Sequence, residues 1–328
     1  MIRHYGKRTS AMFLLAGLLL GLFPPPAAGT VIRSVQHVGS TYLLLADIAH
    51  YYGMNLRTRG PRMELQSRYS HLQFERDRRQ MTLNGVSVHQ SFAPSLWRGQ
   101  PVIGAEDFHT IIEPVLRPLS LRRKPVQRIV LDPGHGGKDS GAEGKRSEEK
   151  DIVLALARRT QSHLQKHGYE VLMTRSGDQF ISLLNRSEIA NRANADLFVS
   201  LHINAVDNAS VRGIETFVLT PSGATSTYGS KRTSTSANGD DFIHHSMRLG
   251  YEIQRQLVAA TRAKDRGIRR ANFAVLRKTK APAVLIEAGF ITNRQEERRL
   301  NSADHQERMA AAITEGIRRY AKAIAPEQ

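Results

Sequence analysis

Residues 128–138 read RIVLDPGHGGK, an apolar run followed by a turn in which His135 stands among glycines. A short apolar run that ends in turn residues is typical of a buried strand in an α/β sheet. A phosphate-binding loop is excluded, because Asp139 stands where that motif needs Ser or Thr and Asp132 where it needs Gly. We therefore expect a buried strand whose glycines free the backbone around one histidine.

Outward from this strand, residues 127–328 alternate between strand-like and helix-like patterns. This alternation predicts an α/β domain with a mixed, mostly parallel sheet flanked by helices. The expected strands are 128–131, 170–173, 196–201, 213–219 and 283–286, and the expected helices are 151–167, 183–194, 241–262 and 304–325.

Residues 30–120 are patterned differently and predict a small α+β module rich in short strands. Asn84-Gly85 lies between two strand-like runs, which is a hairpin signal. Two short helices are expected at 45–52 and 106–116. Residues 121–126, charged and containing Pro125, are interpreted as a linker between the two units.

The first 29 residues are typical of a secretory signal peptide. A basic start precedes an apolar stretch at 11–23, and 27–29 are small residues suited to cleavage. The apolar stretch is too short to span a bilayer of roughly 30 Å as a helix. We expect export to the periplasm, cell wall or exterior, without a stable transmembrane anchor after cleavage; an uncleaved anchor is the alternative.

The amino-acid composition indicates which partners and which metal ligands to expect. The formal net charge of +17 favours anionic polymers of the cell envelope. The cations are spread along the chain without a nucleic-acid motif, so we expect no nucleic-acid partner. There is no cysteine, and any metal must be held by His and carboxylate groups.

Four side chains stand where such a site would form. His135, His202 and Glu287 each follow an expected strand, and the carboxyl ends of strands border the ligand crevice of an α/β sheet. Glu149 begins a helix 14 residues after His135. Two imidazoles and a carboxylate suit a catalytic zinc, and a second carboxylate is then available as a base. Each of these residues, taken alone, also has a structural explanation. Glu149, for example, lies in the first turn of a helix, where a negative charge interacts favourably with the helix dipole.

Six segments, taken in order, are similar to the motifs of the zinc-dependent N-acetylmuramoyl-L-alanine amidases, the third amidase family. The matching segments are 129–142, 149–151, 185–191, 200–205, 265–277 and 282–293. The resemblance covers about 200 residues and implies hydrolysis of the amide bond between muramic acid and L-alanine in peptidoglycan.

The resemblance also implies roles for individual residues. One Zn²⁺ would be held by His135, Glu149 and His202, with Glu287 as the catalytic carboxylate. Glu148 precedes Glu149, so the match can slip by one residue, although the Glu-Lys pair at 149–150 favours Glu149.

Two further polar residues, Arg186 and Asn204, are candidates for binding substrate carboxylate or carbonyl groups, with a structural role as the alternative. Residues 30–120 resemble the copper amine oxidase-like N-terminal module of bacterial envelope enzymes, which implies no copper site. A targeting or regulatory role and plain scaffolding are both open for this module.

The spacing between His202 and Glu287 departs from the simplest family pattern and indicates an insertion at about 206–241, which is rich in Ser, Thr and Gly. In some relatives such a segment covers the zinc until an envelope activator removes it, so autoinhibition is a hypothesis here. Two alternatives to the amidase stay open: a non-catalytic peptidoglycan-binding protein of the same fold, and a zinc peptidase that cuts within the stem peptide.

Overall fold

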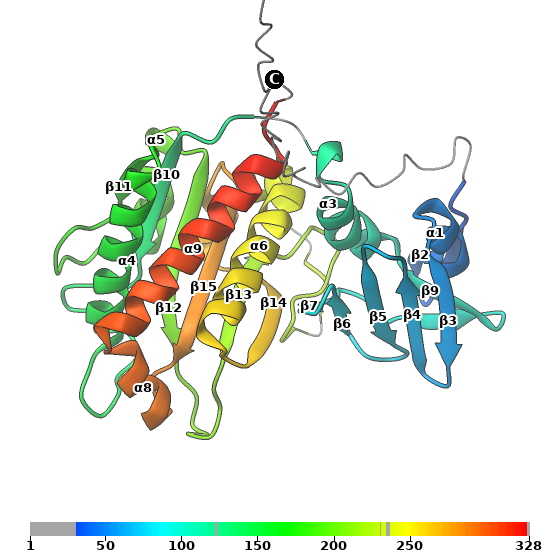
Figure 1. The fold of residues 1–328 in the computed structure, drawn as a ribbon, viewed down its shortest axis with the longest axis horizontal. Helices are drawn as coiled ribbons and strands as arrows, with labels where there is room; N and C mark the ends of the chain where they lie inside the picture. The colour runs from blue at the N-terminus through cyan, green and yellow to red at the C-terminus, as the bar shows by residue number, and fades with distance from the viewer. Residues whose placement is uncertain (1–30, 122–123, 230, 234–236, 327–328) are drawn as a thin grey trace, which may run out of the picture.

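The computed structural model describes residues 31–121, 124–229, 231–233 and 237–326. The expected signal peptide at 1–29 lies outside these residues. The described chain forms an α/β domain with a large mixed sheet and, before it, a smaller strand-rich module (Figure 1). Within the described ranges, none of the helices combines the length and apolar character that crossing a membrane requires.

The central feature is one sheet of 11 strands in the order β11-β10-β12-β15-β13-β14-β7-β6-β5-β4-β3. Strands β11, β10, β12 and β15 run parallel, whereas β13 is antiparallel to β15 and parallel to β14. The mixed, mostly parallel sheet expected for the larger domain is thus confirmed. Its strands are β10 (Arg128–Pro133), β11 (Glu170–Met173), β12 (Leu197–Asn204), β13 (Ile214–Leu219), β14 (Asp265–Ala271) and β15 (Ala283–Phe290).

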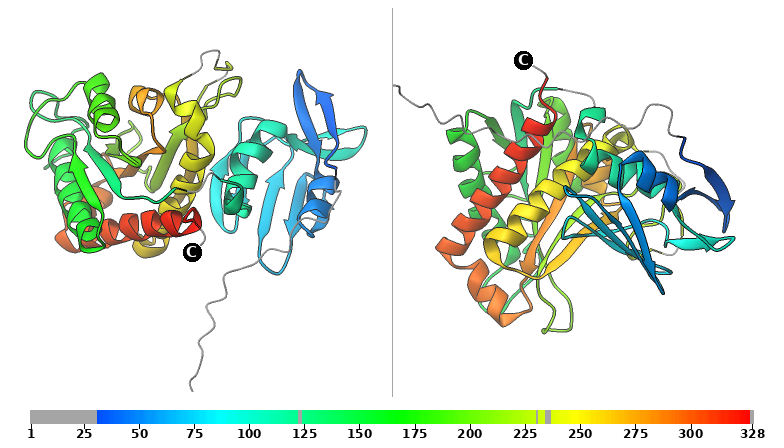
Figure 2. Two further views of the ribbon diagram at one scale, coloured as in Figure 1. Left: turned by 90° about the horizontal axis from the view of Figure 1, so that it is seen from above. Right: turned by 45° about the vertical axis from the view of Figure 1, so that its right-hand side comes forward.

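Helices cover this sheet on both faces. On one face lie α4 (Glu149–Lys166), α6 (Ile243–Thr261) and α9 (Ala303–Ala323), which cross the front of the sheet in Figure 1. The shorter α5 (Leu183–Arg192) and α7 (Ala274–Lys278) pack on the opposite face, which Figure 2 shows from above. Strands β10, β12, β13 and β15 of this sheet are therefore buried on both sides, as their apolar runs predict. A 3₁₀ turn η3 (Asn238–Phe242) precedes α6, and α8 (Arg294–Leu300) precedes α9.

The N-terminal module contributes to two sheets. Its four-stranded sheet consists of β1 (Ser34–His37), β2 (Ser40–Leu44), β9 (Gln100–Gly104) and β8 (Ser95–Trp97). Its remaining strands belong to the large sheet: β3 (Asn55–Arg59), β4 (Arg62–Gln66), β5 (His71–Glu75), β6 (Gln80–Leu83) and β7 (Val86–His89). The module's helices are α1 (Leu45–Tyr51), α2 (Ala105–Asp107), the π-helical turn η1 (Phe108–Ile112), α3 (Glu113–Leu116) and the 3₁₀ turn η2 (Pro118–Ser120).

Two features of the module bear on its relation to the larger domain. The hairpin predicted at Asn84-Gly85 is confirmed, with β6 and β7 paired on either side and both turn residues at positive φ. Strand β7 also pairs with β14, through Val88 and Ile268. The large sheet is therefore continuous across the two units that the linker separates in the sequence.

Several boundaries differ from the sequence expectation. Strands β12 and β15 end three and four residues later than predicted, so His202 and Glu287 lie within strands instead of at their ends. The predicted insertion at 206–241 includes β13, an interior strand of the sheet. Strand β14 was not predicted, because Asp265–Ala271 carries four charged residues and lacks an apolar run.

Candidate metal centre and active site

Two histidines and one glutamate meet at the carboxyl end of β10. His135 lies in the loop after β10, Glu149 is the first residue of α4, and His202 lies in β12. One ligand atom from each of the three lies within 4.8 Å of those of the other two. Glu149 Oε1 is 3.2 Å from His135 Nε2 and 2.9 Å from His202 Nδ1. The structure thus brings together the three residues that the family resemblance implied as ligands.

The adjacent residue, Glu148, is not part of the cluster. Its carboxylate lies 3.3 Å from Lys150 Nζ, and its side chain is 44% exposed. Glu149, in contrast, is 3% exposed. Of the two adjacent glutamates, Glu149 and not Glu148 therefore lies in the cluster with the two histidines.

Glycines make room for this cluster. A Cβ atom at Gly134 would lie 2.2 Å from His202 Cε1, and one at Gly141 would lie 2.6 Å from Glu149 Oε2. Neither position accepts a side chain without displacing a ligand. His135 itself has a φ of 59°, a conformation that is uncommon for a residue with a side chain and is often found at functional sites.

Hydrogen bonds fix the orientation of Glu149. Its Oε1 accepts from the backbone N–H of Ile203 at 2.9 Å and its Oε2 from that of Ala142 at 2.8 Å. Burial works to raise the pKa of Glu149, but hydrogen bonds from His135 and His202 outweigh it and hold the pKa well below the usual value. The carboxylate therefore stays ionised, which a cation ligand requires.

Glu287 lies beside this cluster in a row of polar residues across three strands. On β15 it is in register with His202 of β12 and with Glu215 of β13. Directly paired residues direct their side chains to the same face of a sheet. Leu285 and Phe217, each two residues along their strand, pack on the α5 and α7 side. The side chains of His202, Glu287 and Glu215 therefore lie on the face of the sheet that α5 and α7 cover, two residues along the strands from Leu285 and Phe217.

The surroundings of Glu287 are unusual for a carboxyl group. Its Oε2 is buried and has no hydrogen-bond partner among the described residues. Burial raises the pKa of Glu287 well above its usual value, and the negative charges of Glu149 and Glu215 raise it further. A buried carboxyl group with a free oxygen and a raised pKa has the properties of a general base or acid.

Sequence reasoning missed Glu215 and its partners. Glu215 is fully buried, Arg266 Nε contacts its Oε1, and Arg269 Nε lies 3.2 Å from its Oε2. A signal was available, since Glu215 interrupts the apolar run of 214–219 in the way that Glu287 interrupts its own strand. Its arginine partners are supplied by β14, which the sequence pattern did not reveal.

Asn204 and Arg186, the two predicted substrate contacts, have different environments. Asn204 ends β12 and is partly exposed, with its Oδ1 accepting from the backbone N–H of Ala205. It stays a candidate for contact with substrate. Arg186 is 3% exposed and donates to Asp132 Oδ1 and to the carbonyl oxygens of Pro133 and His135, all within 2.8 Å. In this arrangement Arg186 supports the backbone of the ligand loop, which corresponds to the structural alternative.

Replacing Arg186 is therefore expected to destabilise the fold. Arg186→Ala leaves Asp132, which is fully buried, without its cationic partner, and such a loss costs about 3–5 kcal/mol. Arg192→Ala, on the same helix, removes an exposed pair with Glu188 and should cost less than about 1 kcal/mol. Denaturant unfolding of both variants measures the difference, and equal effects would contradict the structural role.

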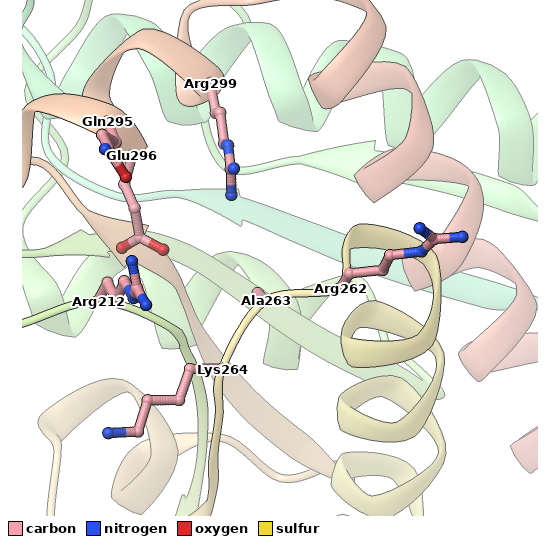
Figure 3. Close-up of a pocket in the computed structure, with 7 residues that line it drawn as sticks. All are labelled: Arg212, Arg262, Ala263, Lys264, Gln295, Glu296 and Arg299. Carbon is pink, nitrogen blue, oxygen red and sulfur yellow. The ribbon is translucent and has the colours of Figure 1, made fainter.

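A second polar hollow lies apart from this site, at the start of β14 and along α8 (Figure 3). It has a volume of about 390 Å³ and contains none of the cluster residues. Its carboxylate, Glu296, accepts from the backbone N–H groups of Phe290 and Gly213, which ties α8 to β15 and β13. The hollow is lined by Arg212, Arg262, Ala263, Lys264, Gln295, Glu296 and Arg299.

The fold and the site together define a class of protein, an α/β protein with a candidate metal centre of two histidines and one glutamate. Comparison with known proteins makes the class specific. A family model described as N-acetylmuramoyl-L-alanine amidase matches residues 129–319. The chain belongs to the N-acetylmuramoyl-L-alanine amidase family, whose members are peptidoglycan hydrolases, and it is an enzyme of this kind.

Individual relatives agree with this assignment. The N-acetylmuramoyl-L-alanine amidase AmiA of Escherichia coli (strain K12) is 36% identical over 217 residues, covering 58% of this chain and 75% of that protein. The solved catalytic domain of the amidase CwlV from Bacillus (Paenibacillus) polymyxa var. colistinus is 34% identical, with a TM-score of 0.52, covering 60% of this chain and 99% of that one. An amidase structure from Clostridium difficile 630 is 33% identical, with a TM-score of 0.52 and coverage of 61% and 98%.

Proposed function

We propose that this chain is an exported zinc amidase that cleaves the bond between N-acetylmuramic acid and the first L-alanine of the stem peptide. The observation that carries the proposal is the meeting of His135, Glu149 and His202 beside Glu287, whose Oε2 is buried. Membership of the amidase family supports the substrate and the bond.

The donor set fits zinc. Two imidazole nitrogens and one carboxylate, with a position left for water, are the ligands of many catalytic zinc sites, and Glu149 is held ionised for this role. When bound by these three residues, zinc supplies Lewis-acid chemistry that lowers the pKa of water to about 7 and polarises a carbonyl group.

Glu287 supplies the proton transfers. Its buried Oε2, which has no partner among the described residues, is free to accept a proton from the attacking water. The same carboxyl group then donates that proton to the departing L-alanine nitrogen. The products are the free lactyl carboxylate on the sugar and the free amino group of the peptide. Asn204, at the end of β12, is positioned as a hydrogen-bonding partner for substrate polar groups.

Digestion of purified peptidoglycan sacculi followed by mass spectrometry tests the proposal. Release of intact stem peptides from uncut glycan strands is the expected result. Cut stem peptides would instead identify a peptidase, and an absence of products, with retained binding to sacculi, would identify a non-catalytic binding protein. A chelator should stop release in the expected case.

The pH dependence offers a further prediction, at Glu215. Glu215→Gln removes one of the charges that raise the pKa of Glu287 and frees Arg266 and Arg269, so the pKa of Glu287 should fall. Because the base must be ionised, the acid limb of the kcat/KM profile should move to lower pH, by roughly one unit. Glu252→Gln, a buried carboxyl on α6 paired with Arg248, is the control and should leave the limb unchanged. A shift of the limb to higher pH would contradict the role of Glu287.

The remaining parts of the chain extend this proposal. We assign residues 1–29 to a signal peptide, 30–120 to an envelope-directed module of the copper amine oxidase-like type, 121–126 to a linker and 127–328 to the catalytic domain. A periplasmic or wall location, peptidoglycan as partner and an envelope activator protein follow from the same reading. Deleting residues 222–239 tests autoinhibition by the insertion, since increased release of stem peptides would support it and unchanged release would count against it.

A further inference from the structure

Between β13 and η3, the described residues 225–229 and 231–233 form a segment that the N-terminal module holds in place. Arg79, between β5 and β6, donates from Nη2 to the carbonyl oxygens of Thr225 and Ser226, both at 2.9 Å. From the segment itself, Arg232 donates to the carbonyl oxygen of Gly39 at 3.1 Å, and its guanidinium lies 5.3 Å from the ring centroid of Phe92. Two arginines thus connect this segment to the module in both directions.

The catalytic domain holds the same segment from the other side. The backbone N–H of Thr227 donates to the carbonyl oxygen of Arg270 on β14, and the N–H of Arg270 donates to Thr227 Oγ1, both at 2.8 Å. Ser226 Oγ lies 2.9 Å from Thr220 Oγ1 at the end of β13. Although residues 225–227 belong to a loop, they have hydrogen bonds to both units.

These contacts fix the position of Tyr228, which follows directly. Its side chain is 70% exposed, yet its hydroxyl lies 3.5 Å from Glu215 Oε2 and its ring centroid 4.9 Å from the Arg269 guanidinium. Glu215 is the register partner of Glu287. An exposed aromatic ring, next to a backbone that is hydrogen-bonded to both units, therefore borders the row that contains Glu287 and His202.

The chemistry around Tyr228 indicates what it contacts. The guanidinium groups of Arg266 and Arg269 are already paired with Glu215. A ligand at this site therefore meets mainly the apolar surface of the tyrosine ring, and not an unpaired charge. Aromatic rings held in place present large contact area at little entropic cost, and a tyrosine combines that surface with a polar tip. The C–H face of a pyranose ring matches such a surface.

We propose that Tyr228 is a substrate-contacting residue, on which a sugar ring next to the cleaved muramic acid packs. Arg79 and Arg232, which we call the clamp, position it. This proposal rests on the function proposed above. It assigns the N-terminal module a part in building the proposed substrate site, through the segment that places Tyr228 beside Glu215.

Steady-state kinetics on two substrates test the proposal. One is a multi-disaccharide glycan strand carrying stem peptides, and the other is muramoyl-peptide with a single sugar. Tyr228→Ala should raise KM for the glycan strand roughly 10-fold, the scale of one aromatic packing contact, with kcat within about twofold of wild type. KM for the single-sugar substrate should not change. Tyr228→Phe and Tyr228→Trp keep the ring and should retain the wild-type KM on both.

Unchanged KM on the glycan strand, or an equal rise on both substrates, would overturn the assignment to a neighbouring sugar ring. A rise that follows the length of the stem peptide would overturn it in favour of a peptide contact. Turnover of the single-sugar substrate by the wild-type enzyme tests the underlying function separately, because a failure there removes the amidase reaction itself.

Variants of the clamp test the positioning role. Arg79→Ala should reproduce the rise in KM for the glycan strand alone, and Arg79→Lys, which keeps a donor, should restore part of it. Arg57→Ala, an exposed arginine on β3, is the matched control and should behave as wild type. Equal KM values for Arg79→Ala and the wild type on the glycan strand would refute a positioning role for the module.

Discussion

Glu287→Gln is expected to lower kcat for stem-peptide release by about 10³-fold or more, within the range that a positioned general base contributes. Gln has nearly the shape of Glu but cannot accept the proton of water, and the position lies in β15 between His202 and Glu215. None of the three proposed ligands is altered, so the variant should bind zinc as the wild type does. Kinetics on sacculi together with metal analysis measure both effects.

The folding stability of the same variant gives an independent check. Because burial raises the pKa of Glu287, the metal-free protein loses stability from this group as the pH rises through that pKa. The variant Glu287→Gln removes the titration, so the metal-free variant should melt higher than the metal-free wild type at alkaline pH and nearly equally in acid. Glu252→Gln serves as the control for replacing a buried carboxyl group. Wild-type kcat in Glu287→Gln would contradict the proposed mechanism.

The second large effect is expected at His202. Replacement by Ala removes an imidazole that lies 2.9 Å from Glu149, and the remaining His135 and Glu149 form an incomplete donor set. Metal affinity should fall by more than about 100-fold, the upper range for losing even an indirect supporting residue, and activity should fall with it. Titration with zinc, followed by activity at each concentration, measures the loss.

A matched histidine separates this effect from general damage. His167, at the end of α4, is exposed and remote from the cluster, so His167→Ala should keep wild-type affinity and turnover. If added zinc restores the activity of His202→Ala, the result still agrees with a weakened metal site. Full activity of His202→Ala without added zinc would contradict the role of His202 as a ligand.

The sequence predicted much of this arrangement where local pattern and motif coincide. The strand before His135, the helix after Glu149 and the hairpin at 84–85 are visible in short windows, because apolar periodicity and turn residues are local properties. The ligand set came from the order of the family motifs, and the structure brings its members within 4.8 Å of one another.

The parts that escaped prediction depend on pairing between distant strands. The row of His202, Glu287 and Glu215 exists because β12, β15 and β13 are adjacent in a particular register, which no local pattern specifies. The burial of Arg186 under the ligand loop is a tertiary contact of the same kind. A polar strand such as β14 is invisible to apolar periodicity, and with it the link to β7.

The pairing of β7 with β14 shows that the N-terminal module is not a separate unit. The linker suggested two separate units, yet β7 continues the large sheet and Arg79 holds the segment that carries Tyr228. The module is therefore a structural neighbour of Tyr228, the proposed substrate contact.

The central claim is that three side chains hold one zinc ion beside Glu287. Anomalous X-ray scattering above and below the zinc absorption edge, from crystals grown with zinc and without chelator, tests it most directly. A single peak at bonding distance, about 2.0–2.2 Å, from His135, Glu149 and His202 is the predicted result. A fully loaded crystal with no peak at these residues, or with its peak elsewhere, would contradict it.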